Sequence, residues 1–391
     1  MSAPRRILFV NHVSRVSGAE LSLVDLLRRL DRARFGPVAV IPGAGELAEL
    51  LAGCGVPCHF LPLRRLRKTF NPFRLVGAAV SVLDVSRQLA ALIRAERIDL
   101  VHANSNTAQL YAGPAARRAG VPCIWHTRDL VSLGPLGHWM GRHATRTLAI
   151  SECVRRHVSR YVRDSATLHV VCSRIAIPEP VTPAARAAAR AEFGWSTEAP
   201  VIGMIGQLVP WKGQRAFIEC AALIAAQISA ARFVIVGGDL FDEHRAYRDE
   251  LQACVAELGL GSRLTFTGQR PDAAALLAGL DVFVHPVERE PLGRVVLEAM
   301  AAGKPVVAVN ACGPGEIIRD RVDGLLSPTA TPAELAAAVL TLIRDPGLAA
   351  RLGAAARLRV ERDFAILQTV QQIATIYDEL LGTEGTHAHR H

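Results

Sequence analysis

Short apolar runs alternate with longer amphipathic runs along this chain, and the alternation forms two successive series. A strand followed by a helix at this spacing predicts a parallel sheet, because parallel strands need a long crossover connection. The runs are almost continuously apolar, which indicates a sheet covered on both faces. We expect strands at Ile7–Val10, Val38–Ile41, Cys58–Leu61, Leu100–Ala103, Cys123–Trp125 and Thr147–Ile150, then at Val201–Ile205, Arg232–Val236, Leu264–Thr267, Val282–His285, Val306–Val309 and Gly324–Ser327. Helices are expected in the first series near 19–30, 72–96, 105–119 and 151–161.

A proline-rich interval at 176–200 separates the two series and reads as the connection between two domains. The prediction is an α/β protein with two Rossmann-like, doubly wound domains, 1–177 and 178–363, facing a central cleft. A C-terminal helix at about 364–382 is expected to pack back on the first domain, and 383–391 to form a disordered tail. Ligands of such sheets bind at the carboxyl ends of the strands.

Composition supports two cores, since hydrophobic residues make up 50% of the 391 residues. No uninterrupted apolar run approaches the roughly 18 residues of a membrane span. The N-terminus leads directly into a strand, so we expect no signal peptide and a cytoplasmic protein. The eight cysteines lack any Cys-x-x-Cys pair and are expected to be buried reduced thiols.

Charge is distributed unevenly between the two halves. Residues 1–177 contain 25 Lys and Arg against 11 Asp and Glu, whereas 178–391 contain 20 against 25. A basic first half favours a peripheral contact with an anionic membrane surface. Aromatic residues make up 5% of the chain, too few for a nucleic-acid stacking platform. The basic residues in question are Arg64, Arg65, Arg67 and Lys68, and, on a predicted helix, Arg155, Arg156, Arg160 and Arg163.

The segment after the strand Val282–His285 has the most specific pattern. We expect a helix with Pro291 in its first turn, stopped at Gly303. Gly293 leaves room at the helix start, where free N–H groups favour an anion. Glu290 and Glu298 would lie roughly 12 Å apart at a helical rise. That separation exceeds the roughly 5–9.5 Å of paired carboxylates in glycoside hydrolysis. Two acceptors flanking an anion site suit an elongated ligand such as a sugar nucleotide.

Other loops follow predicted strands and could line the same site. Lys212 and Gly213 combine a cation with exposed backbone donors, which suits a departing pyrophosphate. The chain has three lysines, so a lysine at this position is notable, although a solvent-exposed turn residue is the alternative. Gly18 opens another strand-to-helix loop and could bring backbone N–H groups to a phosphate.

His126 follows a buried strand, where it could donate to a sugar hydroxyl or act as an acid or base. The alternative is a structural histidine beside a surface pair of Arg128 and Asp129. The neighbouring loop with His102 and Asn104 is expected to form an acceptor-side wall. Further loop segments could complete a donor wall: Gly237-Gly238-Asp239, Phe266-Thr267-Gly268 and Ala311-Cys-Gly313-Pro-Gly315-Glu316.

Taken together, these motifs resemble the retaining glycosyltransferases of family four, which have the GT-B fold. The resemblance runs from Ser-Gly18-Ala-Glu through Pro-Trp-Lys212-Gly and Glu290-x7-Glu298 to Gly313-Pro-Gly-Glu, nearly the whole chain. It implies transfer of a sugar from a nucleotide-diphosphate sugar to a glycan or lipid-linked acceptor with retention of configuration. It also implies no metal and no cofactor beyond the donor substrate, and a role in cell-surface polysaccharide or glycoconjugate biosynthesis.

The resemblance assigns roles residue by residue, in two groups. His126, Glu290 and Lys212 would form the catalytic set, contacting the transferred sugar and the pyrophosphate. The donor-binding set would be Gly18, Gln207, Lys212, Gly213, Gly238, Glu290, Leu292, Gly293, Arg294 and Glu298. Within it, Leu292 and Gly293 would offer backbone N–H groups to donor oxygens, and Glu298 would bind the ribose hydroxyls.

Gln207 departs from the family pattern, because many members have an arginine there beside the lysine. Glutamine supplies no charge, so Lys212 would act alone or with help from Arg294. Two other functions therefore stay open: a non-catalytic sugar-nucleotide-binding subunit, and a nucleotide-sugar epimerase of the same fold. Epimerised donor in the absence of acceptor would indicate the epimerase, and donor binding without transfer the binding subunit.

Overall fold

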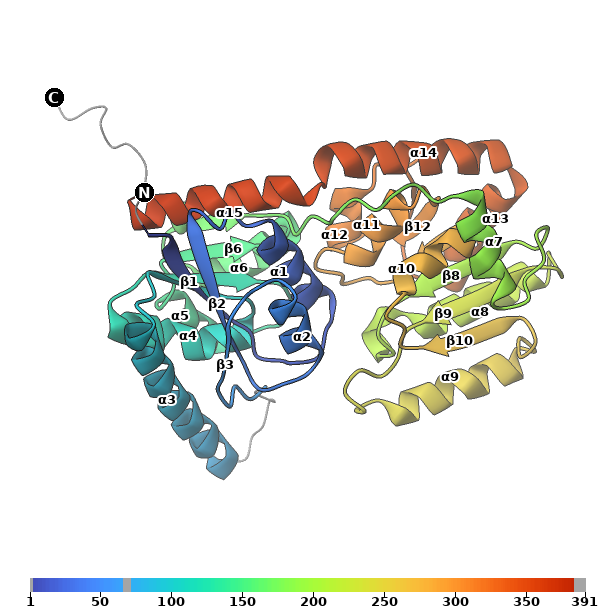
Figure 1. Cartoon of the computed structure of the whole chain (residues 1–391). Coiled ribbons are helices and arrows are strands. Elements are labelled where there is room, and N and C mark those ends of the chain that lie inside the picture. Colours follow the sequence, from blue (N-terminus) through green and yellow to red (C-terminus); the bar gives the residue numbers. More distant parts are fainter. Residues whose placement is uncertain (1–2, 66–71, 383–391) are drawn as a thin grey trace. The chain divides into compact units, whose positions relative to one another are not determined.

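The computed structural model describes residues 3–65 and 72–382 and divides into two compact units (Figure 1). Unit 1 contains the chain up to Arg174 together with the segment from Ile366, and unit 2 is Ile175–Ala365. The sequence-based boundary after residue 177 falls in the segment that connects them. The expected tail at 383–391 lies outside the described residues, as do 66–71.

Within the described part of unit 1, seven strands form one parallel sheet in the order β3-β2-β1-β4-β5-β6-β7. The chain starts in the middle of this sheet and winds outward in both directions, as in a doubly wound fold. Residues 7–10 of β1 are fully buried, because helices cover both faces. The strands are β1 (Arg5–Val10), β2 (Phe35–Ile41), β3 (Cys58–Phe60), β4 (Leu100–Ala103), β5 (Cys123–Thr127), β6 (Arg146–Ala149) and β7 (Leu168–Val170).

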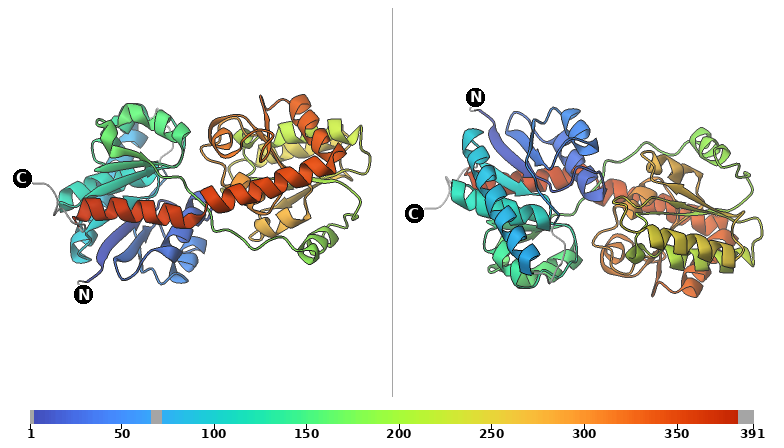
Figure 2. Two further views of the ribbon diagram at one scale, coloured as in Figure 1. Left: turned by 90° about the horizontal axis from the view of Figure 1, so that it is seen from above. Right: turned by 90° about the horizontal axis from the view of Figure 1, so that it is seen from below.

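The helices of unit 1 include one from the far end of the sequence. This helix, α15 (Ile366–Leu381), lies along the sheet of unit 1 (Figure 2). Its Tyr377 packs edge-on against Phe35 of β2 and His102 of β4. The packing of a C-terminal helix on the first sheet was expected from the sequence. The others are α1 (Gly18–Arg29), α2 (Glu46–Ala52), α3 (Pro72–Ala95), α4 (Asn106–Ala119), α5 (Gly134–Gly141) and α6 (Glu152–Val158).

Helix α3 packs on α4 only through its C-terminal half, and its N-terminal half points away from the rest of unit 1 (Figure 1). Val76, Val80 and Leu83 are 64%, 59% and 45% exposed. The stretch Val76–Ala95 is long and apolar enough to cross a membrane, with mean hydropathy 1.5 and 33% of it buried. The sequence reading overlooked this stretch because Asp84 and two arginines interrupt the apolar run.

The described part of unit 2 has six strands in the order β10-β9-β8-β11-β12-β13, all paired in parallel. The strands are β8 (Val201–Ile205), β9 (Arg232–Val236), β10 (Leu264–Gly268), β11 (Val282–His285), β12 (Val306–Val309) and β13 (Leu325–Ser327). The helices are α7 (Pro183–Ala191), α8 (Gln214–Ala225), α9 (Arg245–Glu257), α10 (Ala273–Leu276), α11 (Arg294–Ala301), α12 (Cys312–Ile317), α13 (Pro332–Arg344) and α14 (Pro346–Asp363). One core cluster joins one face of the sheet to α8, α9 and α13.

One local expectation in unit 2 was wrong. Helix α11 begins at Arg294, not at Pro291, because Gly293 is its N-cap in a left-handed conformation and Pro291 lies in the preceding turn. At α13, Thr331 is the N-cap, and the carboxylate of Glu334 accepts from Thr329.

The cysteines only partly follow the expectation of buried thiols. Cys123, Cys220 and Cys254 are buried free thiols, and burial raises the pKa of the first two to about 12. Three further free cysteines, Cys54, Cys58 and Cys172, are partly exposed.

Candidate functional site

Most of the predicted site residues follow strands at the point where the chain order of each sheet reverses, whereas His126 lies in β5 and Gly238 follows β9. In unit 2 this point falls between β8 and β11, whose carboxyl ends lead to Gln207 and to the segment with Glu290. In unit 1 it falls between β1 and β4, which lead to Asn11 and Asn104. Loops at such a switch point diverge and leave room for a ligand.

Lys212 and Glu290 form an ion pair at the β8/β11 switch point. Lys212 Nζ lies 2.5 Å from Glu290 Oε2, and their side chains are 24% and 11% exposed. His285, the last residue of β11, places its Nε2 3.2 Å from the same oxygen. The structure therefore brings together the predicted cation and carboxylate and adds a buried histidine.

Glu290 stays ionised in this setting. Burial alone would raise its pKa, but Lys212 and His285 outweigh burial and lower the pKa to about 2. A charged carboxylate can accept hydrogen bonds from hydroxyl groups and cannot donate a proton. The arrangement suits binding of sugar hydroxyls, not general acid chemistry at Glu290.

Glycines bring backbone segments into close contact around this pair. Gly213 is the N-cap of α8 with φ +75°, and a Cβ there would lie 2.4 Å from the carbonyl oxygen of Pro286. A Cβ on Gly313 would lie 2.2 Å from the carbonyl oxygen of Leu292. Side chains are excluded at these positions, which explains the glycines in the motifs after β8 and β12.

The start of α11 provides the predicted backbone donors. Gly293 has φ +93° and caps the helix without a side chain, directly after Leu292. The first N–H groups of a helix have no partner within the helix, and the helix dipole favours an anion beside them. This eight-residue helix thus presents its N-terminus next to the Lys212–Glu290 pair.

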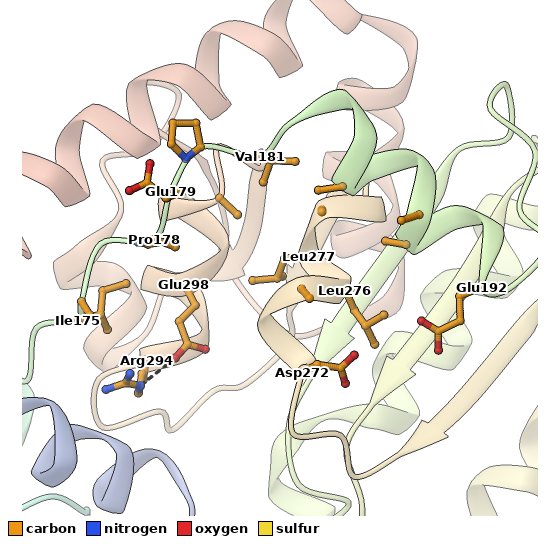
Figure 3. Close-up of a pocket in the computed structure, with 18 residues that line it drawn as sticks. Ile175, Pro178, Glu179, Val181, Glu192, Asp272, Leu276, Leu277, Arg294 and Glu298 are labelled. Carbon is orange, nitrogen blue, oxygen red and sulfur yellow. Dashed lines mark hydrogen bonds and ion pairs between the residues drawn. The ribbon is translucent and has the colours of Figure 1, made fainter. Parts of the chain in front are cut away.

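Glu298 and Arg294 lie on the wall of a cavity of about 670 Å³ within unit 2 (Figure 3). Arg294 Nε donates to Glu298 Oε1 at 2.8 Å. The other walls come from the connecting segment 175–181, α7 and α10, including the apolar Leu276 and Leu277. Neither Lys212 nor Glu290 lines this cavity. The predicted residues of unit 2 therefore form two groups along the segment 290–298.

Gln207 and Gly238 contribute through their backbones. Gln207 O accepts from Gln214 Nε2 at 2.6 Å, and Gly238 O accepts from Leu208 N at 3.0 Å. Arg294 was the other cation considered beside Lys212, and in the structure its guanidinium pairs with Glu298. Lys212 is the cation that contacts Glu290.

In unit 1, His126 is fully buried inside β5 and its ring contacts His102 of β4. The alternative reading of the sequence put Arg128 and Asp129 together as a surface pair, and the structure gives the two side chains other partners. Arg128 donates to Asn104 Oδ1 and Ser173 Oγ, whereas Asp129 accepts from Asn106.

Gly18 begins α1 and lies in a capped turn. Ser17 precedes it as the N-cap, and Glu20 Oε2 accepts from Ser17 N at 3.1 Å. Glu20 Oε1 also accepts from Asn11 Nδ2 at 3.2 Å, which joins this turn to the end of β1. The Ser-Gly-Ala-Glu motif is therefore a capping box that leaves the backbone at Gly18 without a covering side chain.

Sequence reasoning missed His285 and Tyr377. His285 ends the strand before the Glu290 segment, so its position directly upstream was the available signal. Tyr377 lies 275 residues from His102, its hydrogen-bond partner, and no local pattern could reveal that contact. Among the described residues, no group of three or more His, Cys, Asp or Glu side chains could hold a metal ion.

Comparison with known proteins yields matches over most of the chain. Residues 16–173 match the family model Glycosyltransferase Family 4, and residues 185–359 match Glycosyl transferases group 1. The 2-deoxystreptamine glucosyltransferase of Streptomyces kanamyceticus is 29% identical over 348 residues, covering 83% of this chain and 88% of that protein. The lipopolysaccharide core biosynthesis glycosyltransferase LpsE of Rhizobium meliloti is 32% identical over 163 residues, covering 42% and 45%.

A solved structure is similar over nearly the whole length. The crystal structure of Anabaena HepE in complex with UDP-glucose has a TM-score of 0.82 at 26% identity, covering 96% of this chain and 99% of that chain. Two parallel-sheet α/β units with such neighbours define a glycosyltransferase of the GT-B fold. The chain belongs to glycosyltransferase family four.

Proposed function

We propose that this glycosyltransferase moves a sugar from a nucleotide-diphosphate sugar to a glycan or lipid-linked acceptor, with retention of anomeric configuration. The observation that carries the proposal is the Lys212–Glu290 pair beside the N-terminus of α11. It combines a cation and backbone donors for a diphosphate with an ionised acceptor for sugar hydroxyls.

The leaving nucleotide gains negative charge as the bond from the sugar to the diphosphate breaks. Lys212 and the N–H groups at Leu292 and Gly293 would bind the diphosphate oxygens and stabilise that charge. Glu290 would accept from hydroxyls of the transferred sugar once the donor separates it from Lys212. These residues provide the required positive charge, so the proposal includes neither a metal nor a cofactor.

The nucleoside would bind on the other side of Gly293. Glu298 would accept from the ribose hydroxyls, and the adjoining cavity has apolar walls at Leu276 and Leu277 against which a base can pack. Its volume of about 670 Å³ is typical of small-molecule pockets. HepE, bound to UDP-glucose in its crystal structure, supports a UDP-sugar as the first donor to test.

The acceptor class and pathway rest on relatives. LpsE acts in lipopolysaccharide core biosynthesis by its name, which supports a cell-surface glycan as the acceptor class. Retention is what family four implies, and the anomeric coupling constant of the product in proton NMR tests it. An inverted product would contradict that part.

Transfer assays with substituted protein test the catalytic assignment. Glu290→Gln and Lys212→Ala should each lower kcat/KM by a factor on the order of 10² to 10³, because each removes a charge that contacts the donor. The control is Glu361→Gln, a partly exposed carboxylate on α14. Unchanged turnover in the first two variants would defeat the assignment, and donor binding without transfer by the wild type would indicate a binding subunit.

We also propose that unit 1 contacts an anionic membrane surface through the exposed stripe of α3. Val76, Val80, Leu83 and Arg87 recur at helical spacing on one face, and all four are exposed. Arg64 and Arg65 are exposed shortly before the helix. An apolar stripe with neighbouring cations matches an anionic bilayer interface.

This contact revises the sequence-based one. Of the basic groups expected to bind the membrane, Arg67 and Lys68 lie outside the described residues, and Arg155 pairs with Glu152 at 2.5 Å. The apolar residues of α3 are the stronger argument.

Sedimentation with vesicles tests the membrane proposal. At low salt the wild type should sediment with phosphatidylglycerol vesicles and not with phosphatidylcholine vesicles. Changing Val76, Val80 and Leu83 together to serine should remove most of this binding. A control with Leu358→Ser and Leu367→Ser, which alter residues 66% and 59% exposed on other helices, should bind like the wild type. Equal binding by both variants would contradict the proposal.

A further inference from the structure

His126 has a buried ring nitrogen with no hydrogen-bond partner among the described residues. The side chain is fully buried, and its Nε2 contacts no acceptor or donor there. Buried polar groups in folded proteins are almost always satisfied, so an unsatisfied one near the carboxyl end of β5 indicates a ligand. The other nitrogen of the same ring is bonded to protein groups.

A chain of hydrogen bonds leads from α15 to that histidine. Tyr377 Oη lies 2.7 Å from His102 Nδ1, and His102 Nε2 lies 3.0 Å from His126 Nδ1. The three residues come from α15, β4 and β5, and all are fully buried or nearly so. Such a chain can run in either direction, depending on which nitrogens carry the protons.

Arg128 determines which atoms donate and which accept in this chain of hydrogen bonds. Its Nη2 lies 3.3 Å from His126 Nδ1 and also donates to Asn104 Oδ1 at 2.8 Å. A guanidinium can only donate, so His126 Nδ1 must be an acceptor. His102 Nε2 must then donate to it, which makes His102 Nδ1 the acceptor for the Tyr377 hydroxyl. The remaining proton of neutral His126 is on Nε2, the open position.

The protonation states agree with this assignment. Burial and then the charge of Arg128 lower the pKa of His102 to about 3. Burial, Arg128 and His102 lower the pKa of His126 well below its ordinary value. Burial raises the pKa of Tyr377, so the phenol keeps its proton. These are the titratable and charged groups that contact the chain of bonds.

We propose that Tyr377 and His102 are positioning residues that fix His126 as the neutral Nε2–H tautomer, so that it donates a hydrogen bond to an acceptor oxygen of the bound substrate. The inference rests on the proposed function for the identity of that substrate, a sugar. With its proton on Nε2, His126 has no lone pair at the open position and does not act as a base there. Of the roles open from the sequence, donation to a sugar hydroxyl is the one this geometry supports.

The tautomer can be measured without any substrate. In ¹⁵N-histidine-labelled full-length protein, two-bond ¹⁵N–¹H spectra assigned with His126→Gln and His102→Gln distinguish the two ring nitrogens. We expect both rings protonated at Nε2 and no titration of either between pH 5 and 8. A proton on His126 Nδ1, or titration near pH 6.5, would overturn the proposal.

Tyr377→Phe tests whether the hydroxyl acts on His126 or only on stability. It removes the donor to His102 and keeps the packing of the ring. We expect mixed tautomers at His102 and His126 in the spectra and a fall in kcat/KM of about tenfold. The matched control is Tyr111→Phe, which removes another buried hydroxyl of unit 1, bonded to the backbone of Arg64.

Equal spectra and equal kcat/KM in the wild type and Tyr377→Phe would overturn the positioning role. An equal loss of kcat/KM in Tyr377→Phe and Tyr111→Phe, with unchanged tautomers, would show that the Tyr377 hydroxyl acts on stability alone. That result would also overturn the positioning role. A wild type without any transfer activity would instead contradict the proposed function, and the tautomer spectra would still decide the inference.

Discussion

A single buried ion pair connects the two chemical tasks of unit 2. Lys212 neutralises Glu290 in this structure, and the donor would compete for both groups, because a diphosphate attracts the ammonium and sugar hydroxyls donate to the carboxylate. Removing one partner of such a pair leaves an uncompensated charge in a poorly solvated place.

Lys212→Met should therefore destabilise the protein at neutral pH by about 3 kcal/mol. In the wild type the pKa of Glu290 is about 2, below the ordinary 4.5, so the pair stabilises the fold above pH 4.5 and is lost as the pH falls toward 2. In the variant, only His285 still opposes burial, so the pKa of Glu290 is higher than in the wild type and Glu290 is neutralised as the solution is acidified. The gap in thermal midpoint between the two proteins should narrow from pH 7 to pH 4, and a constant gap would argue against this account.

The buried histidines predict a second dependence on pH. The pKa of His102 is about 3 in the folded chain against 6.5 in the ordinary state, so folding is favoured above pH 6.5 and progressively less below it. His102→Gln removes this group and should give a thermal midpoint that declines less between pH 6.5 and 4. Parallel curves for the two proteins would contradict the assignment.

At the scale of elements, strand-to-helix turns position the site, and glycines permit the close contacts in them. Gly213→Ala should lower stability by about 1–3 kcal/mol and weaken nucleotide binding, because φ +75° and the contact with Pro286 exclude a Cβ. Gly261→Ala is the control, since nothing lies within 4 Å of a Cβ there. Denaturant unfolding and calorimetry measure both effects, and equal behaviour of the two variants would contradict the role of the turn.

Elements with strong patterns were predictable from the sequence, and weak ones were not. Strands such as Val201–Ile205 and Val306–Val309 match to the residue, because runs buried on both faces have clear ends. The three-residue β7 and the seven-residue α2 were missed because short elements carry little periodicity. The start of α11 was placed three residues early because proline suits a first turn, whereas a left-handed glycine caps this helix.

The candidate site was likewise predictable only where sequence motifs were strong. Glu290 and Lys212 could be paired from motifs that follow adjacent strands, and the structure puts them 2.5 Å apart. The bond from Arg294 to Glu298 and the chain from Tyr377 to His126 depend on side-chain directions and on a long-range contact. Neither leaves a signal in one sequence.

At the scale of the molecule, unit 1 is completed by the last helix of the chain. Tyr377 and Ile373 of α15 are fully buried, each contributing about 1.5–3 kcal/mol of apolar burial. Truncation after Ala365 should therefore unfold unit 1 and leave unit 2 folded, with its nucleotide affinity within about twofold of the full chain. Limited proteolysis and calorimetry test this, and a protease-resistant unit 1 in the truncated chain would be the opposing result.

The central claim is that unit 2 binds an activated sugar through the charges on either side of Gly293. Calorimetric titration with UDP-glucose, followed by a panel of other nucleotide-diphosphate sugars, tests it most directly. The account predicts that one donor binds the wild type and that Lys212→Met and Glu298→Gln each weaken it at least tenfold, whereas Gly261→Ala does not. Equal affinity in all four proteins, or no binding of any donor, would contradict it.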